Sequence, residues 1–275
     1  MILDRRVLFK NNTALNDISM KVTGVKADGS LFDYVAGEDY LYVGAVLPFN
    51  HLYFDLSVVN AVSTAVTVEF WDGMAWVEMV DVMDETVALS KSGKISWTVP
   101  RDRSWIYELD SYDVTGLETT VIYQMYWARI SFGANLTGTT AISMIGQKYC
   151  DEDYLFALYP DLNQTQLFEQ YEVGKTTWDD QIVIASDMIR SYLRNKGIIK
   201  SGDQILKPDL LQDACAHKTA ELIMAAFGTA YNDNKAAAKK EFEGSINMRF
   251  FAVDLNRDTI LSTAERNASS GTLTR

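Results

Sequence analysis

The stretch Glu69-Phe70-Trp71-Asp72-Gly73-Met74-Ala75-Trp76 contains the strongest hairpin signal in the chain. An Asp-Gly pair between two aromatic-rich segments is typical of a tight β-hairpin, because glycine readily adopts the positive φ that such a turn requires. We therefore expect two antiparallel strands, with Trp71 and Trp76 near one another across the hairpin.

Apolar and polar residues alternate in short runs on both sides of this hairpin, up to about residue 148. Each run is bounded by residues typical of turns, such as Lys91-Ser92-Gly93-Lys94. Alternation over four to eight residues predicts strands with one buried face. Because no helical pattern intervenes, we expect an antiparallel β-sandwich. The predicted strands are Ile18–Val22, Tyr40–Val46, Leu52–Val58, Val66–Trp71, Ile95–Val99, Ile106–Leu109, Tyr126–Phe132 and Ala141–Ile145.

After Cys150 the apolar residues recur with the 3.6-residue period of a helix. A short helix over Asp151–Tyr159 is expected to end at Pro160. A second begins after Thr177 as its N-cap, with Trp178, Ile182, Ala185, Ile189 and Tyr192 as its apolar stripe. A third has Pro208 at its first position, and a fourth covers about residues 234–251. These segments predict a small helical bundle.

The change of period divides the chain into an α+β, two-domain protein. We expect a β-sandwich over residues 1–148, a helical bundle over 149–253 and an extended C-terminal arm over 254–275. The arm is rich in small polar residues and should be disordered when alone in water.

Composition argues against several functional classes. The net charge of −12 is unfavourable for binding nucleic acid, although it suits a surface past which DNA slides. The longest apolar run, Leu41–Phe49, is too short for a membrane helix, and the N-terminus does not resemble a signal peptide. We therefore expect a soluble protein that is made in the cytoplasm.

Catalytic motifs are not evident in the sequence, and we do not expect an enzyme. The chain has two histidines and two cysteines, Cys150 and Cys215, which we expect to be free thiols. Cys215 and His217 are two residues apart on a predicted helix, so they do not share a face and form a poor nucleophile pair.

The six tryptophans leave two interpretations open. They could stack on sugars, as aromatic residues of carbohydrate-binding β-sandwiches do, or they could fill the space between two sheets. The second interpretation is favoured because the tryptophans are scattered through strands and are not clustered in one loop.

One segment has the ligand spacing of a calcium loop. Asp254, Asn256, Asp258, Ser262 and Glu265 occupy positions 1, 3, 5, 9 and 12 of an EF-hand pattern. The sixth position is threonine, where the sharp turn normally requires glycine. A simple helix end and turn is the competing interpretation, so Ca²⁺ is the only cofactor that the sequence raises, and none is otherwise expected.

The helical half resembles the head–tail adaptor, or connector, proteins of tailed bacteriophages. The residues that carry the resemblance are Tyr149-Cys150-Asp151-Glu152-Asp153-Tyr154-Leu155, the Trp178–Ile189 helix, the segment from Asp209 to Ile223, and the last helix with its Asp-rich turn and polar arm. The first half resembles β-sandwich modules of phage structural proteins, through the hairpin, Ser92–Trp97 and Tyr126–Ile130. The sandwich departs from the minimal adaptor, which is mostly helical.

The resemblance implies a virion protein at the neck, in a ring of about twelve copies beneath the portal. Its partners would be the portal ring, a downstream neck or tail protein and other copies of itself, while DNA passes without specific binding and no membrane is involved. The arm would reach the portal, with Arg266, Asn267, Leu273 and Arg275 as contact residues. The alternatives are another tail, collar or baseplate component, and a carbohydrate-binding module on a helical anchor.

Overall fold

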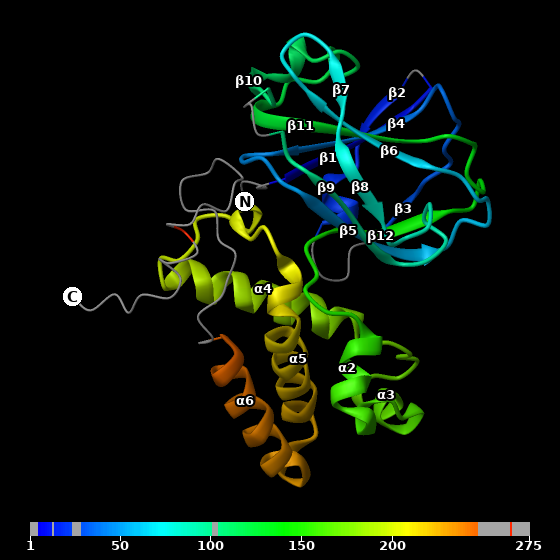
Figure 1. Cartoon of the computed structure of the whole chain (residues 1–275). Coiled ribbons are helices and arrows are strands. Elements are labelled where there is room, and N and C mark those ends of the chain that lie inside the picture. Colours follow the sequence, from blue (N-terminus) through cyan, green and yellow to red (C-terminus); the bar gives the residue numbers. More distant parts are fainter. Residues whose placement is uncertain (1–4, 13, 24–28, 101–103, 247–264, 266–275) are drawn as a thin grey trace. The chain divides into compact units, whose positions relative to one another are not determined.

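The computed structural model in Figure 1 describes residues 5–12, 14–23, 29–100, 104–246 and 265. The described chain divides into two compact units, one ending at Gly146 and the other beginning at Gln147. The first unit is built from antiparallel β-sheets and the second from helices, so the predicted α+β class is confirmed. Each unit is described by itself below.

The larger sheet of the first unit has seven strands, all paired antiparallel. β11 is the longest strand, and both β6 and the short strand β10 pair with it. In spatial order the strands are β2 (Ala14–Asp17), β1 (Arg5–Asn11), β4 (Tyr40–Ala45), β11 (Tyr123–Phe132), β6 (Val66–Trp71) and β7 (Trp76–Glu78), with β10 (Tyr107–Asp110) on β11.

The second sheet has five antiparallel strands, and β5 and β12 are joined with irregular register. Its spatial order is β3 (Ser30–Leu31), β12 (Ala141–Gly146), β5 (His51–Val58), β9 (Gly93–Thr98) and β8 (Val80–Asp84).

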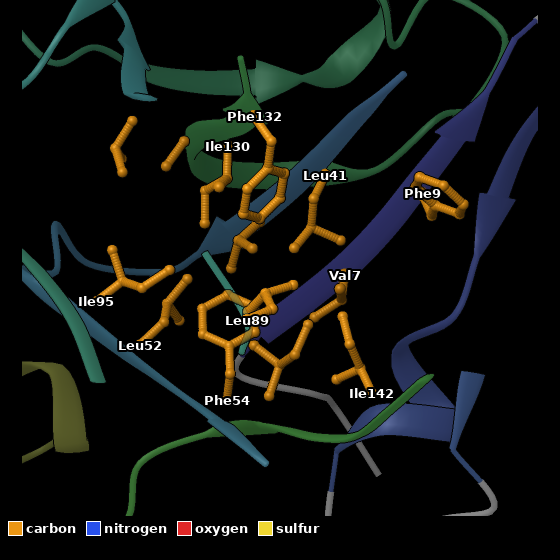
Figure 2. Packing of buried hydrophobic residues seen from close by; sticks show 14 of the residues in the cluster. Val7, Phe9, Leu41, Leu52, Phe54, Leu89, Ile95, Ile130, Phe132 and Ile142 are labelled. Carbon is orange, nitrogen blue, oxygen red and sulfur yellow. The ribbon is translucent and has the colours of Figure 1, made fainter. Parts of the chain in front are cut away.

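The main core of this unit is formed by apolar side chains of both sheets (Figure 2). Leu52, Phe54, Ile95 and Ile142 from the second sheet pack with side chains of β1, β4 and β11 from the first. Burial of these apolar side chains is the main force that holds the two sheets together. The partners from the first sheet include Val7, Phe9, Leu41, Ile130 and Phe132.

The larger sheet is buried on its outer face as well. Leu8, Tyr42, Trp71 and Trp127 form a separate cluster there. Trp127 lies against Gly44 of the neighbouring strand, where an added Cβ would be only 2.8 Å from the indole ring. A glycine is therefore required in the middle of β4, although glycine weakens strands in general.

One predicted strand is wrong. Residues 19–22 form a short helix, α1 (Ser19–Val22), and not part of a strand over Ile18–Val22. Asp17 accepts a hydrogen bond from the Ser19 backbone N–H at 2.9 Å, while the Ser19 hydroxyl accepts one from Val7 N at 2.8 Å. These local side-chain bonds favour a turn of helix over continued pairing.

The second unit is a set of helices joined by short connections. Its α-helices are α2 (Glu152–Leu158), α3 (Thr165–Tyr171), α4 (Asp179–Asn195), α5 (Gln212–Ala226) and α6 (Asn232–Ile246). Single 3-10 turns stand between them, namely η2 (Pro160–Leu162), η3 (Gly202–Gln204), η4 (Pro208–Leu211) and η5 (Gly228–Tyr231). None of the helices in the described part of the chain has both the length and the apolar character needed to cross a bilayer.

Trp178 lies at the centre of the helical core. Its ring stacks on Phe168 of α3 with centroids 4.7 Å apart, and its Nε1 donates to the Leu162 carbonyl at 2.9 Å. Ile182, Ala185 and Ile189 are fully buried below it, as the predicted stripe requires. The predicted N-cap Thr177 is wrong, because α4 begins one residue later, after Trp178, and no side chain caps that end.

Candidate interaction surface

The predicted hairpin forms, as β6 and β7 with Trp71 opposite Trp76. The Asp72 carboxylate accepts hydrogen bonds from the backbone N–H groups of Ala75 and Met74, at 2.7 and 2.8 Å. These bonds lower the pKa of Asp72, because they favour its charged form. Gly73 adopts a φ of +95°, which explains the glycine in the turn.

The hairpin is tied to the segment that contains β10. Trp71 Nε1 donates to Glu108 Oε1 at 2.8 Å, and Trp76 Nε1 donates to the Thr115 carbonyl at 2.9 Å. The backbone N–H of Ile106 also donates to the Trp71 carbonyl at 3.1 Å. Both indoles of the hairpin therefore hold in place the strand β10 and the loop that follows it.

The loop between β10 and β11 has buried apolar anchors of its own. Val114, Leu117 and Ile122 lie in the cluster on the outer face of the larger sheet. Gly116 passes over the ring of Tyr42, with no room for a Cβ, and has a φ of +94°. These buried side chains therefore hold the loop against the outer face of the larger sheet.

Polar contacts fix the two ends of this loop. Asp110 caps the 3-10 turn η1 (Ser111–Asp113) by accepting from the Tyr112 backbone N–H at 2.9 Å. The Ser111 hydroxyl donates to the Thr120 carbonyl and accepts from the Ile122 N–H. Residues 111 and 120–122 are therefore held side by side at the base of the loop.

Arg129 lies on the outer face of the larger sheet, beside the hairpin. Arg129 makes two hydrogen bonds of 2.7 Å to Glu69, and its guanidinium lies over the rings of Tyr40 and Trp76, at 4.3 and 4.8 Å from their centroids. Burial opposes its charge, but the hydrogen bonds and the charge of Glu69 outweigh burial and raise the pKa of Arg129. Planar two-point pairing and stacking are contacts that arginine makes and lysine does not.

The tryptophans do not form an exposed platform. Five of them are buried and Trp76 is half-buried. The expectation that they lie between the two sheets holds for Trp97 and Trp105, whereas Trp71 and Trp127 pack on the outer face of the larger sheet. This burial argues against a stacking site for sugars built on tryptophan.

The exposed side chains of the same region are also apolar or aromatic. We call the residues 106–112 and 121–123, which comprise β10, the start of β11 and their flanks, the β10–β11 ribbon. Leu109 is 71% exposed, Tyr123 67%, Tyr112 63% and Val121 58%. Ile106 and Tyr107 are exposed to a smaller extent. By register, Tyr107 and Leu109 lie on one face of β10 and Tyr123 on the other. Exposed large apolar side chains on both faces of a short strand pair are a feature of sites that contact another molecule.

The ribbon and the loop between its two parts carry acidic side chains and no basic ones. Residues 104–128 contain Glu108, Asp110, Asp113 and Glu118 and have no lysine or arginine. The surface therefore combines exposed tyrosine and leucine side chains with negatively charged side chains. The sequence predicted a strand at Ile106–Leu109 but did not identify this surface. The alternation of residues indicates a strand, but it does not tell which other elements of the fold cover that strand.

The helical unit has a shallow groove along one face of α4. Ile184, Met188 and Tyr192 line it at helical spacing, together with Asp187, Ser191 and Asn195, and its volume is about 380 Å³. These residues lie beside the stripe that packs into the core, so α4 has a second, partly apolar stripe next to its buried one.

The cysteines and His217 do not form a nucleophile and base. Cys215 is buried and contacts the Ser186 hydroxyl at 3.4 Å, whereas His217 Nδ1 is 2.7 Å from the Tyr159 hydroxyl. Cys150 and Cys215, far apart in sequence, are both buried in the core of the helical unit, and the neighbouring Cys215 together with burial raises the pKa of the Cys150 thiol well above its ordinary value. The geometry suits two reduced thiols that help to fill the core.

The site residues predicted in the arm fall almost entirely outside the described residues. This holds for the portal-contact residues Arg266, Asn267, Leu273 and Arg275 and for four residues of the calcium pattern, Asp254, Asn256, Asp258 and Ser262. Glu265, the last residue of the pattern, is described and is buried. Within the described ranges, no three His, Cys, Asp or Glu side chains are grouped to hold a metal ion.

Comparison with known proteins adds no family assignment. No protein-family model matches the chain, and no curated protein matches it. The inference of function therefore starts from the surfaces described above and from the sequence.

Proposed function

We propose that the chain is a structural protein of a tailed-phage virion, a head–tail adaptor that joins a ring beneath the portal and lines the DNA channel. The observation that carries the proposal is the β10–β11 ribbon. It has exposed apolar side chains and is held in place by the indoles of Trp71 and Trp76, by buried apolar anchors of the loop that follows β10, and by a capped turn. A surface fixed in this way suits permanent contact with a neighbouring protein.

The helical unit supports the same proposal. A ring of identical subunits needs a surface on which each copy contacts the next. The groove of α4, with the half-buried Ile184 and the exposed Met188 beside polar residues, provides an apolar stripe of the kind that packs against a neighbouring helix. We assign this groove to contact between copies and the C-terminal arm to contact with the portal.

Charge is compatible with a conduit for DNA. The net charge of −12 disfavours retention of the genome on the inner surface of a ring. The protein would thus act after synthesis in the host cytoplasm as part of the virion neck, with DNA passing and not binding.

The location of the protein in the particle tests this proposal. We expect a nanogold label on a short N-terminal tag to appear at the neck in electron micrographs of assembled virions. Label at the baseplate or along the tail would instead establish the alternative, another structural component. Purified virions that lack the protein would contradict a structural role altogether.

A further inference from the structure

We propose that the β10–β11 ribbon binds an extended, basic segment of a neighbouring protein, which pairs with the outer edge of β10. This inference rests on the proposed function for its setting, a neighbour in the virion. It goes further by naming the chemistry of the partner and the way in which it binds.

The backbone of β10 supplies the first reason. Among the described residues, β10 pairs only with β11, so its second long edge has no strand beside it. A strand edge offers N–H and C=O groups that an added extended segment can use, which is a recurrent mode of peptide recognition. Because side chains alternate along an added strand, every second residue of the segment would lie on the same face as Tyr107 and Leu109.

The side chains of the ribbon supply the second reason. Leu109, Tyr112 and Tyr123 are each more than half exposed. Tyrosine presents a large, rigid apolar surface that loses little conformational entropy on binding. The face of its ring also attracts the cations of arginine and lysine. Tyr107 and Leu109 lie on one face of β10, whereas Tyr123 pairs with Asp110 and lies on the opposite face. One set of alternating side chains of an added segment would therefore contact Tyr107 and Leu109, and the other set would contact Tyr123 and the carboxylate of Asp110.

The charge of this surface favours a partner of opposite charge. Asp110, Asp113 and Glu118 lie on β10 or on the loop that follows it, without a basic residue between positions 104 and 128. A basic segment gains attraction here, whereas a nucleic acid or an anionic lipid surface is repelled. Another copy of this acidic chain is also disfavoured, because like charges would meet across the interface. The acidic edge therefore discriminates against self-association while it remains open to a basic strand.

The rigidity of the ribbon favours binding with little reorganisation. Trp71 fixes β10 through Glu108, and Trp76 fixes the loop that follows β10 through Thr115. A preformed edge avoids part of the entropy cost that limits association with flexible surfaces. The segment of the partner, not the ribbon, is the part that becomes ordered.

A titration of the whole chain with a defined probe tests the inference. The probe is a capped peptide of alternating lysine and valine, and its matched control alternates glutamate and valine. The readout is the backbone amide NMR signals of residues 107–110 and 121–123 in the isotope-labelled protein. We expect saturable shifts in this region with the lysine peptide, weakened by added salt, and none with the glutamate peptide.

Surface variants locate the binding. Leu109→Lys places a like charge beside the incoming peptide and should weaken binding about tenfold or more. Met20→Lys is the matched control, because Met20 is equally exposed on the same unit but lies on α1. The neutral variant with Asp110→Asn, Asp113→Asn and Glu118→Gln should keep the fold and lose most of the dependence on salt.

Three results would overturn the inference: no saturable shift with the lysine peptide, equal shifts with the glutamate peptide, or unchanged binding by Leu109→Lys. The outcome is separate from that of the proposed function. If the peptide binds but the nanogold label lies away from the neck, the ribbon assignment holds and the neck assignment fails. If the nanogold label lies at the neck but the peptide does not bind, the neck assignment holds and the ribbon assignment fails.

Discussion

The indole of Trp71 and the carboxylate of Glu108 are joined by a hydrogen bond of 2.8 Å, although the two residues are 37 positions apart in the sequence. Trp71 belongs to the hairpin, and Glu108 belongs to β10, the edge strand of the β10–β11 ribbon. This bond connects the part of the sandwich that is most evident from sequence with the surface to which we assign binding.

Removal of the acceptor should therefore destabilise the first unit. Because Trp71 is buried, Glu108→Ala leaves its indole N–H without this acceptor, and the expected loss is about 1–3 kcal/mol in the free energy of unfolding. Glu108→Gln keeps an oxygen that can accept and should cost less than half as much. Urea denaturation followed by tryptophan fluorescence measures both. Equal losses for the two variants would contradict the role of the hydrogen bond.

Gly44 and Trp127 should be energetically coupled. A Cβ at position 44 would lie 2.8 Å from the indole of Trp127, so Gly44→Ala should cost about 1–3 kcal/mol through overpacking. Trp127→Ala should cost about 3–5 kcal/mol as the loss of a fully buried aromatic residue. In the double variant the clash is absent, and the total loss should be clearly smaller than the sum of the single losses. Additive losses in this double-mutant cycle would show that the contact does not constrain the strand.

The helical unit should become less stable in mild acid because of His217. Burial lowers the pKa of His217, although Asp213 and Glu241 act in the opposite direction. The unfolded chain therefore takes up the proton first, at a pKa of about 6.5, and stability is lost as the pH falls from that value toward the folded pKa. Melting temperatures measured between neutral pH and mild acid should fall more steeply for the natural chain than for His217→Gln. Identical slopes would assign the acid sensitivity to other groups.

Calcium binding by residues 254–265 is a separate prediction. If the loop is occupied, added Ca²⁺ should raise the melting temperature and a chelator should reverse the change, because a ligand that binds only the folded state stabilises it. The double variant Asp254→Ala, Glu265→Ala should remove the response. Unchanged melting of the natural chain with and without chelator would favour the alternative of a simple helix end and turn.

The sequence predicts elements well where the signal is local. The hairpin with Gly73 in its turn and the buried stripe of α4 with Ile182, Ala185 and Ile189 depend on neighbouring residues, and they are confirmed. Pro208 was predicted as the first residue of the third helix, but it begins the 3-10 turn η4, and α5 begins at Gln212. Strand β1 (Arg5–Asn11) was missed, because Val7, Leu8 and Phe9 are buried on both faces of the sheet and do not alternate. Alternation of apolar and polar residues indicates a strand with one buried face, and it is absent from a strand whose two faces are both buried.

The candidate surface was less predictable, for a related reason. The alternation at Ile106–Leu109 indicates a strand but not whether a second sheet covers it. The exposure of Tyr107 and Leu109 follows from the pairing of β10 with the first residues of β11, before the part of β11 that pairs with β6. Likewise, the contact of Cys150 with Cys215 depends on how α5 packs, which no spacing in the sequence reports.

Mass photometry of the cognate portal ring, mixed either with the full chain or with a chain that ends at Val253, tests the central claim most directly. The account predicts saturation at about twelve added copies for the full chain and no added mass for the shortened one, because we propose that the arm makes the portal contact. A circular dichroism spectrum with unchanged helix and sheet content would show that the shortened chain is folded. Association of neither chain with the portal would contradict the neck assignment, and equal association of both would contradict the role of residues 254–275.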